Sequence, residues 1–146
     1  MVFEQGPYLK AAVFCDSVIE GKDGVLSLIR IIDRLTTTAS GPGAPEEMPP
    51  VANQMKAALM LVSGRATGSQ EVKLVVEEPS GMRKELWAGT VHLEGNDRGQ
   101  NLIMNFGMEF RTEGLYWFDV LLGDDLLTRM PFRIIYARLS HGLPGS

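Results

Sequence analysis

A two-residue alternation of side chains constrains this chain more than any other feature of its sequence. Between residues 101 and 111, large apolar side chains occupy every even position, and polar or charged side chains occupy most odd positions. Related alternations recur over residues 71–77 and 126–136. Because a period of two sends neighbouring side chains to opposite faces of a strand, these segments are predicted to form β-strands. One apolar and one polar face is typical of an antiparallel sheet.

Short apolar runs separated by glycine and proline extend this pattern along the chain. They cover residues 8–20, 25–35, 55–62, 70–78, 82–93, 101–111, 115–122 and 126–136. The turns Gly21–Gly24 and Gly123–Asp125 are short enough to join antiparallel neighbours. About eight strands at this spacing predict a β-sandwich or a β-barrel.

Residues 54–62 fit two secondary structures. Met55, Leu59 and Val62 would share one face of a helix, whereas Met55, Ala57, Leu59 and Leu61 would share one face of a strand. We favour the strand, because the neighbouring runs are strands.

Two further segments are predicted from proline and glycine. The segment Thr36–Pro50 contains four prolines and reads as one long, exposed Pro/Gly-rich loop. Ser140–Ser146 reads as a frayed tail. Pro131 lacks a backbone N–H, so the last strand is predicted to be a sheet edge or to contain a bulge there. An open edge is a place where another chain can add.

Composition bounds the class of protein. The 146 residues, of which 45% are hydrophobic and 22% charged, fit a single domain over residues 1–146 and exclude bulk disorder. A net charge of −4 without a basic block argues against nucleic-acid binding and against an anionic membrane surface. Neither a spanning apolar run nor a signal peptide is apparent, so we expect a cytoplasmic protein. A single cysteine excludes an internal disulfide.

Several short motifs resemble a family of small uncharacterised bacterial proteins, classed as a domain of unknown function. They are an opening strand that ends in Cys15-Asp16, a second strand that ends in Asp33-Arg34, and Gly114-Leu115-Tyr116 near the end. The resemblance implies a bacterial protein with an immunoglobulin-like fold, and it supplies no activity, cofactor or catalytic residue. The fold class is therefore expected to be an all-β antiparallel sandwich, immunoglobulin-like or jelly-roll-like.

Residues with reactive side chains do not form a recognisable catalytic motif. Cys15 lies within an apolar run and reads as a small buried hydrophobe rather than a nucleophile. His92 and His141 are the only histidines, too few for an ordinary zinc site without carboxylates. No calcium loop, P-loop or nucleophile elbow is present. We therefore assign no catalytic, cofactor-binding or metal residues and leave open whether the protein is an enzyme.

Aromatic and aliphatic residues indicate a surface for interaction. If Tyr116 and Phe118 face the core, Trp117 points outward with Leu115 and Leu121, and such apolar patches often mark binding sites. Pro131 extends this candidate interaction surface to the last strand. Residues 28–32 are apolar on both faces, which predicts a central strand with a covered outer face.

These features favour a non-catalytic module that binds another protein or a second copy of itself. The alternative is a sandwich that binds a small ligand or carbohydrate, with Trp87 or Trp117 as the stacking platform. An enzyme built around His92 is the third hypothesis.

Overall fold

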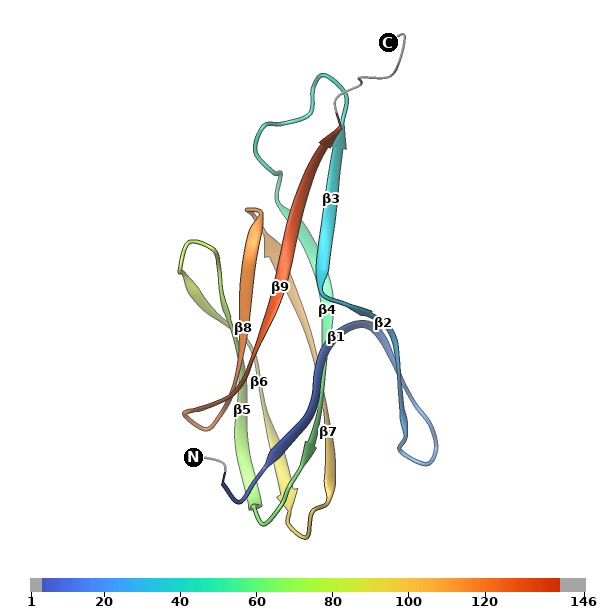
Figure 1. Ribbon diagram of the computed structural model, residues 1–146, viewed down its shortest axis with the longest axis vertical. Helices are drawn as coiled ribbons and strands as arrows, with labels where there is room; N and C mark the ends of the chain where they lie inside the picture. Colours follow the sequence, from blue (N-terminus) through green and yellow to red (C-terminus); the bar gives the residue numbers. More distant parts are fainter. Residues whose placement is uncertain (1–3, 140–146) are drawn as a thin grey trace.

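The computed structural model describes residues 4–139, which form nine β-strands and contain no helix (Figure 1). The strands are β1 (Tyr8–Glu20), β2 (Leu26–Ile32), β3 (Arg34–Ser40), β4 (Val51–Val62), β5 (Thr67–Glu77), β6 (Arg83–Glu94), β7 (Gly99–Phe110), β8 (Gly114–Leu122) and β9 (Asp125–Leu139). The predicted tail Ser140–Ser146 lies outside the described residues. Within residues 4–139, no helix is long and apolar enough to cross a membrane.

The strands form two sheets, which confirms the predicted β-sandwich. The four-stranded sheet has the order β2-β1-β4-β7, and the five-stranded sheet has the order β3-β9-β8-β5-β6. Every neighbouring pair is antiparallel except β3 and β9, which run parallel along one side of the molecule (Figure 1).

The ninth strand arises because the run predicted over residues 25–35 divides between the two sheets. β2 remains beside β1, whereas β3 crosses to β9, and the backbone N–H of Arg133 donates to the carbonyl of Asp33 at the crossing. The prediction of a loop from Thr36 was therefore wrong for its first five residues. Three consecutive threonines, 36–38, favour an extended backbone, and pairing with β9 supplies hydrogen-bond partners for that backbone.

The segment with two possible structures is a strand. β4 pairs with β1 on one side and with β7 on the other, so its backbone is hydrogen-bonded on both sides. Ala57, Leu59 and Leu61 are buried between the sheets. Tertiary pairing therefore outweighs the helix propensity of this segment.

Aromatic rings from both sheets meet in the core. Phe14 of the four-stranded sheet makes edge contacts with Phe118 and Phe132 of the other, at centroid distances of 4.9 and 5.2 Å. Phe110 packs edge-on against Tyr116 at 5.0 Å. Such edge-to-face pairs add to the hydrophobic effect of burying each ring.

Two tyrosine hydroxyls hold connections against the sandwich. Tyr116 Oη donates to the carbonyl of Thr112 at 2.6 Å, the contact made by the tyrosine corner of many Greek-key sandwiches. Tyr136 Oη donates to the carbonyl of Pro45 at 2.6 Å, and Met48 is buried in the core. The long loop, predicted to be exposed, is thus anchored at two points.

Strand β2 departs from expectation. It is an edge strand rather than a central one, and Ile29 and Ile31 remain 40% and 60% exposed. Arg30 between them adopts a positive φ of 57°, which interrupts the alternation of side chains. The apolar residues on both faces therefore do not indicate a covered strand here.

Pro131 lies at an edge only locally. β9 as a whole is an inner strand, but its pairing with β3 begins at Arg133, so Pro131 precedes that pairing. The Arg133 N–H points toward β3, and alternation puts the position of Pro131 on the same side. Any other residue at position 131 would direct a backbone N–H to the side of β9 that β3 does not cover there, and proline has no such N–H.

Candidate functional site

The predicted interaction residues lie on the outer face of the five-stranded sheet. On β8, Tyr116, Phe118 and Val120 are buried in the core, and the alternate residues Leu115, Trp117 and Leu121 are half-buried on the opposite face. Trp117 is paired in register with Pro131 on β9. We refer to Leu115, Trp117, Leu121 and Pro131 as the Trp117 surface.

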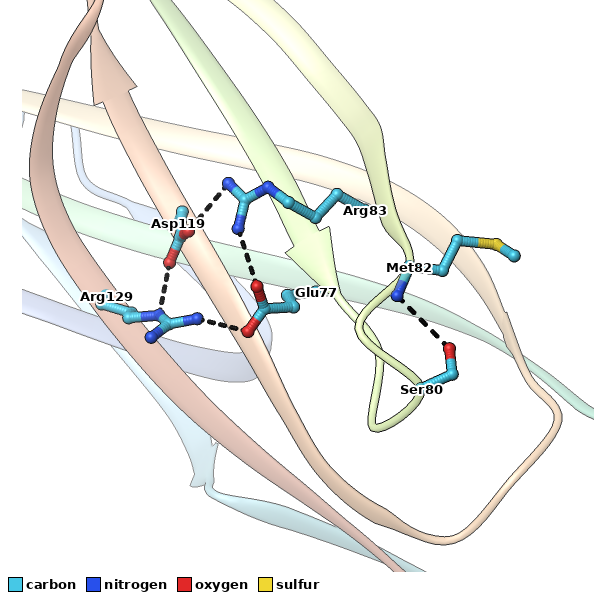
Figure 2. Close-up of polar contacts among 6 residues, drawn as sticks. All are labelled: Glu77, Ser80, Met82, Arg83, Asp119 and Arg129. Carbon is cyan, nitrogen blue, oxygen red and sulfur yellow. Dashed lines mark hydrogen bonds and ion pairs between the residues drawn. The ribbon is translucent and has the colours of Figure 1, made fainter.

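Four charged side chains beside Trp117 form a closed ring of ion pairs, which we call the ion ring (Figure 2). They come from four adjacent strands: Glu77 from β5, Arg83 from β6, Asp119 from β8 and Arg129 from β9. Arg83 donates to Glu77 at 3.2 Å and to Asp119 at 2.9 Å. Arg129 donates to Asp119 at 2.9 Å and to Glu77 at 2.6 Å. Each arginine therefore bridges both carboxylates.

Burial makes Asp119 the centre of this ring. It is only 5% exposed, whereas the side chains of Arg83 and Arg129 are 43% and 39% exposed. The hydrogen bond to Asp119 is the main cause that raises the pKa of the Arg83 guanidinium above its ordinary value. Two positive and two negative groups neutralise one another, so the ring fixes side-chain geometry without adding net charge.

The ion ring also positions Trp117. The guanidinium carbon of Arg129 lies 4.7 Å from the centroid of the indole, within the range of a cation–π contact. Because Arg129 is held by two carboxylates, the ion ring limits how the indole of Trp117 can move. One face of Trp117 is consequently covered by an arginine.

Sequence reasoning missed the ion ring. Alternation could have put Asp119 and Arg129 on outward faces. It could not show that β5, β6, β8 and β9 are neighbours, since that order depends on the folded sheet.

Cys15 is buried as predicted, at 1% exposure. It alternates with core-facing Phe14 and is paired with Lys56 and Ile31, so the thiol lies on the outer side of the four-stranded sheet. Burial raises the pKa of the thiol, which disfavours the thiolate that a nucleophile requires.

The histidines and the aspartates of the short motifs are dispersed. His92 is exposed on β6, with Nδ1 3.3 Å from Ser69 Oγ, and His141 lies outside the described residues. Asp16 pairs with Arg30, and Asp33 lies 3.8 Å from Arg34. In the described part of the chain, no three histidine, cysteine or acidic residues are grouped in a way that could hold a metal ion.

Trp87, the second candidate stacking platform, is partly buried and packs against the hydrophobic core. Its ring lies over Gly89, where an added Cβ would come within 2.3 Å of the indole. One face of each indole is therefore already occupied, by Arg129 at Trp117 and by Gly89 at Trp87.

Solved structures resemble the chain at low identity. A β-glucosidase from Listeria innocua in complex with isofagomine shares 6% identity over 90% of this chain and 17% of that protein, with a TM-score of 0.50. A β-glucosidase 3B from Thermotoga neapolitana in complex with glucose shares 11% identity over 60% of this chain, with a TM-score of 0.44. This chain covers only 16% of that enzyme, and at such identities the likeness concerns the fold alone.

An immunoglobulin-like protein from Pseudomonas aeruginosa has a more similar length. It shares 16% identity over 90% of this chain and 98% of its own, with a TM-score of 0.43. No curated protein sequence matches the chain. A family model matches residues 10–135. The chain therefore belongs to the family of unknown function DUF6941.

Proposed function

We propose that this chain is a protein-binding β-sandwich module, and that the Trp117 surface is its contact for a partner. The observation that carries the proposal is an indole held by an ion ring, centred on the buried Asp119, on the outer face of a sheet. Tryptophan and arginine are enriched among the residues that dominate binding energy. A side chain already held in one orientation loses little entropy when a partner binds.

The partner is a protein with an apolar contact for Trp117 and Leu121 and polar groups that meet the exposed guanidinium edges of Arg83 and Arg129. We place this interaction in the cytoplasm of a bacterium. A single cysteine, which excludes an internal disulfide, is compatible with that location. Stacking of a small carbohydrate has less support, because Arg129 covers one face of Trp117 and Gly89 one face of Trp87.

The test compares the proteins that three baits capture from a lysate of the native host. Wild type, Trp117→Ala and a matched control, Met60→Ala on the outer face of the other sheet, would be used as baits. A protein enriched by wild type and by Met60→Ala would then be purified and titrated calorimetrically. We expect Trp117→Ala to weaken binding by about 2 kcal/mol or more, a loss typical of a hot-spot residue. Equal affinity for all three baits would refute the Trp117 surface as the interface.

A further inference from the structure

Each sheet ends in two edge strands, and β7 differs from the other three. Edge strands commonly carry features that prevent pairing with another chain, such as charges, proline, bulges or short length. β2 has seven residues and is bent at Arg30. β3 also has seven residues and begins with Arg34. β6 begins with Arg83-Lys84-Glu85, and its pairing with β5 is shifted by a bulge.

β7 lacks these features apart from one charged residue. It is 12 residues long, contains no proline, and pairs with β4 without a register shift from Gly99 to Phe110. Its only charged residue is Glu109, near one end. No strand within residues 4–139 pairs with its other side. A long, regular and nearly uncharged edge is suited to pairing with a further strand.

We propose that β7 pairs with β7 of a second copy of this chain, antiparallel about a two-fold axis near Asn105. The two four-stranded sheets then form one continuous eight-stranded sheet. This surface is separate from the Trp117 surface, so the proposal does not depend on the proposed function.

The sequence of β7 is compatible with itself in this register. On the outer face, Ile103 lies opposite Gly107 of the second copy, where no side chain competes for the space between the strands. On the inner face, Met104 lies opposite Phe106. Glu109 lies opposite the uncharged Asn101, so no like charges meet although each chain carries a net charge of −4.

A groove at the end of β7 offers additional apolar contact. It has a volume of about 360 Å³ and lies between the β5–β6 connection and β7, with Met82 and Met108 on its wall. Met82 is 65% exposed. In the proposed register Leu102 of the second copy lies opposite Met108, beside this groove. Methionine side chains adapt readily to such a neighbour.

The first test measures dimerisation by sedimentation equilibrium. Asn101 is exposed on β7. In the proposed register Asn101 of each copy lies opposite Glu109 of the other, so each dimer contains two such pairs. Asn101→Glu should therefore raise the dimer dissociation constant about tenfold, whereas Asn101→Lys should leave it unchanged or lower it. Ser27→Glu and Ser27→Lys, on the exposed far edge strand β2, provide the charge-matched controls and should give equal constants.

The second test locates the two-fold axis by disulfide formation in a Cys15→Ala background. Asn105→Cys would place two thiols opposite each other, at a Cα separation of about 4.5–5.5 Å that a disulfide can span. Asn101→Cys would place them about 27 Å apart along the strands and serves as the control. We expect a disulfide-linked dimer from Asn105→Cys only.

Three results would overturn the proposal. They are a wild-type protein that stays monomeric up to millimolar concentration, a dimer with the same dissociation constant in Asn101→Glu and Asn101→Lys, and a dimer abolished by Trp117→Ala. The last result would assign self-association to the Trp117 surface instead.

Discussion

The outer faces of the two sheets carry different kinds of side chain. On the five-stranded sheet, four neighbouring strands each contribute one charged residue to the ion ring around the nearly buried Asp119 (Figure 2). On the four-stranded sheet, the middle of the outer face holds Cys15 and Ala58, both 1% exposed, beside Ile103. One outer face is thus cross-linked by four ion pairs, whereas the middle of the other holds small and apolar side chains beside Lys56, which donates to Asn105 at 2.6 Å.

This difference shows how one sandwich can keep two surfaces distinct. Salt bridges across strands fix the positions of side chains, which suits a face that recognises a particular partner. A sheet whose edge strand makes no cross-strand ion pair, as at β7, can be extended there through backbone hydrogen bonds alone. If the two faces differ in this way, ion pairs on the five-stranded sheet should contribute more to the free energy of unfolding than those on the four-stranded sheet.

The largest expected effect is the loss of Asp119. Asp119→Ala removes the more buried of the two carboxylates that Arg83 and Arg129 share, and should lower the free energy of unfolding by about 2 kcal/mol. The loss is smaller than for a fully buried pair, because water reaches both arginines. Urea titration measures it.

Asp16→Ala is the matched control on the four-stranded sheet. It breaks the ion pair between Asp16 and Arg30, whose side chains are 44% and 75% exposed, respectively. Because water surrounds both groups, the free energy of unfolding should fall by about 0.5 kcal/mol or less. Similar losses in the two variants would show that the ion ring contributes no more than an ordinary surface pair.

An intermediate effect is expected at Arg129. Arg129→Gln removes two hydrogen bonds and the cation that lies over Trp117, and should cost about 1 kcal/mol. In a Trp87→Phe background, the Trp117 emission should shift to longer wavelength and become easier to quench with acrylamide. Arg133→Gln, exposed on the same strand, should change neither property. An unchanged emission in Arg129→Gln would mean that Arg129 does not shield the indole.

The smallest effect concerns Cys15 and depends on pH. Burial raises the pKa of the folded thiol above its ordinary value of 9.0, so the unfolded chain releases this proton first as pH rises. Proton release then favours the unfolded state, and the thiol's contribution to stability is present below pH 9 and lost above it.

Cys15→Ala should therefore differ from wild type by a constant amount between pH 7 and 8. By pH 10 wild type should have lost stability relative to the variant, because the unfolded chain has released the thiol proton that the folded chain still holds. Urea titrations at each pH measure both proteins. Parallel pH profiles would indicate that Cys15 is more accessible to water than its position suggests.

The alternation of side chains predicted most of the fold correctly. The run 8–20 coincides with β1, and most other runs agree with observed strands within a few residues. The predictions failed where pairing depends on distant segments. Nothing local indicates that the run 25–35 divides at Asp33, because β3 is held by β9, about one hundred residues later in the chain.

The candidate surface was predicted in part. Alternation alone put Trp117, Leu115 and Leu121 opposite the core, because neighbouring residues in a strand face opposite ways. The exposed Ile29 and Ile31 were misread as signs of a covered strand. Whether such residues are covered depends on the position of the strand in the sheet, which a single strand's sequence does not encode.

The sequence by itself determined the all-β class, most strand positions and the face on which most side chains lie, since a two-residue period is a local property of the backbone. The tertiary structure decided which strands are neighbours. Strand order brought Glu77, Arg83, Asp119 and Arg129 into one ring and left β7 at an edge. These features depend on contacts between residues far apart in the chain, which form only when the two sheets assemble.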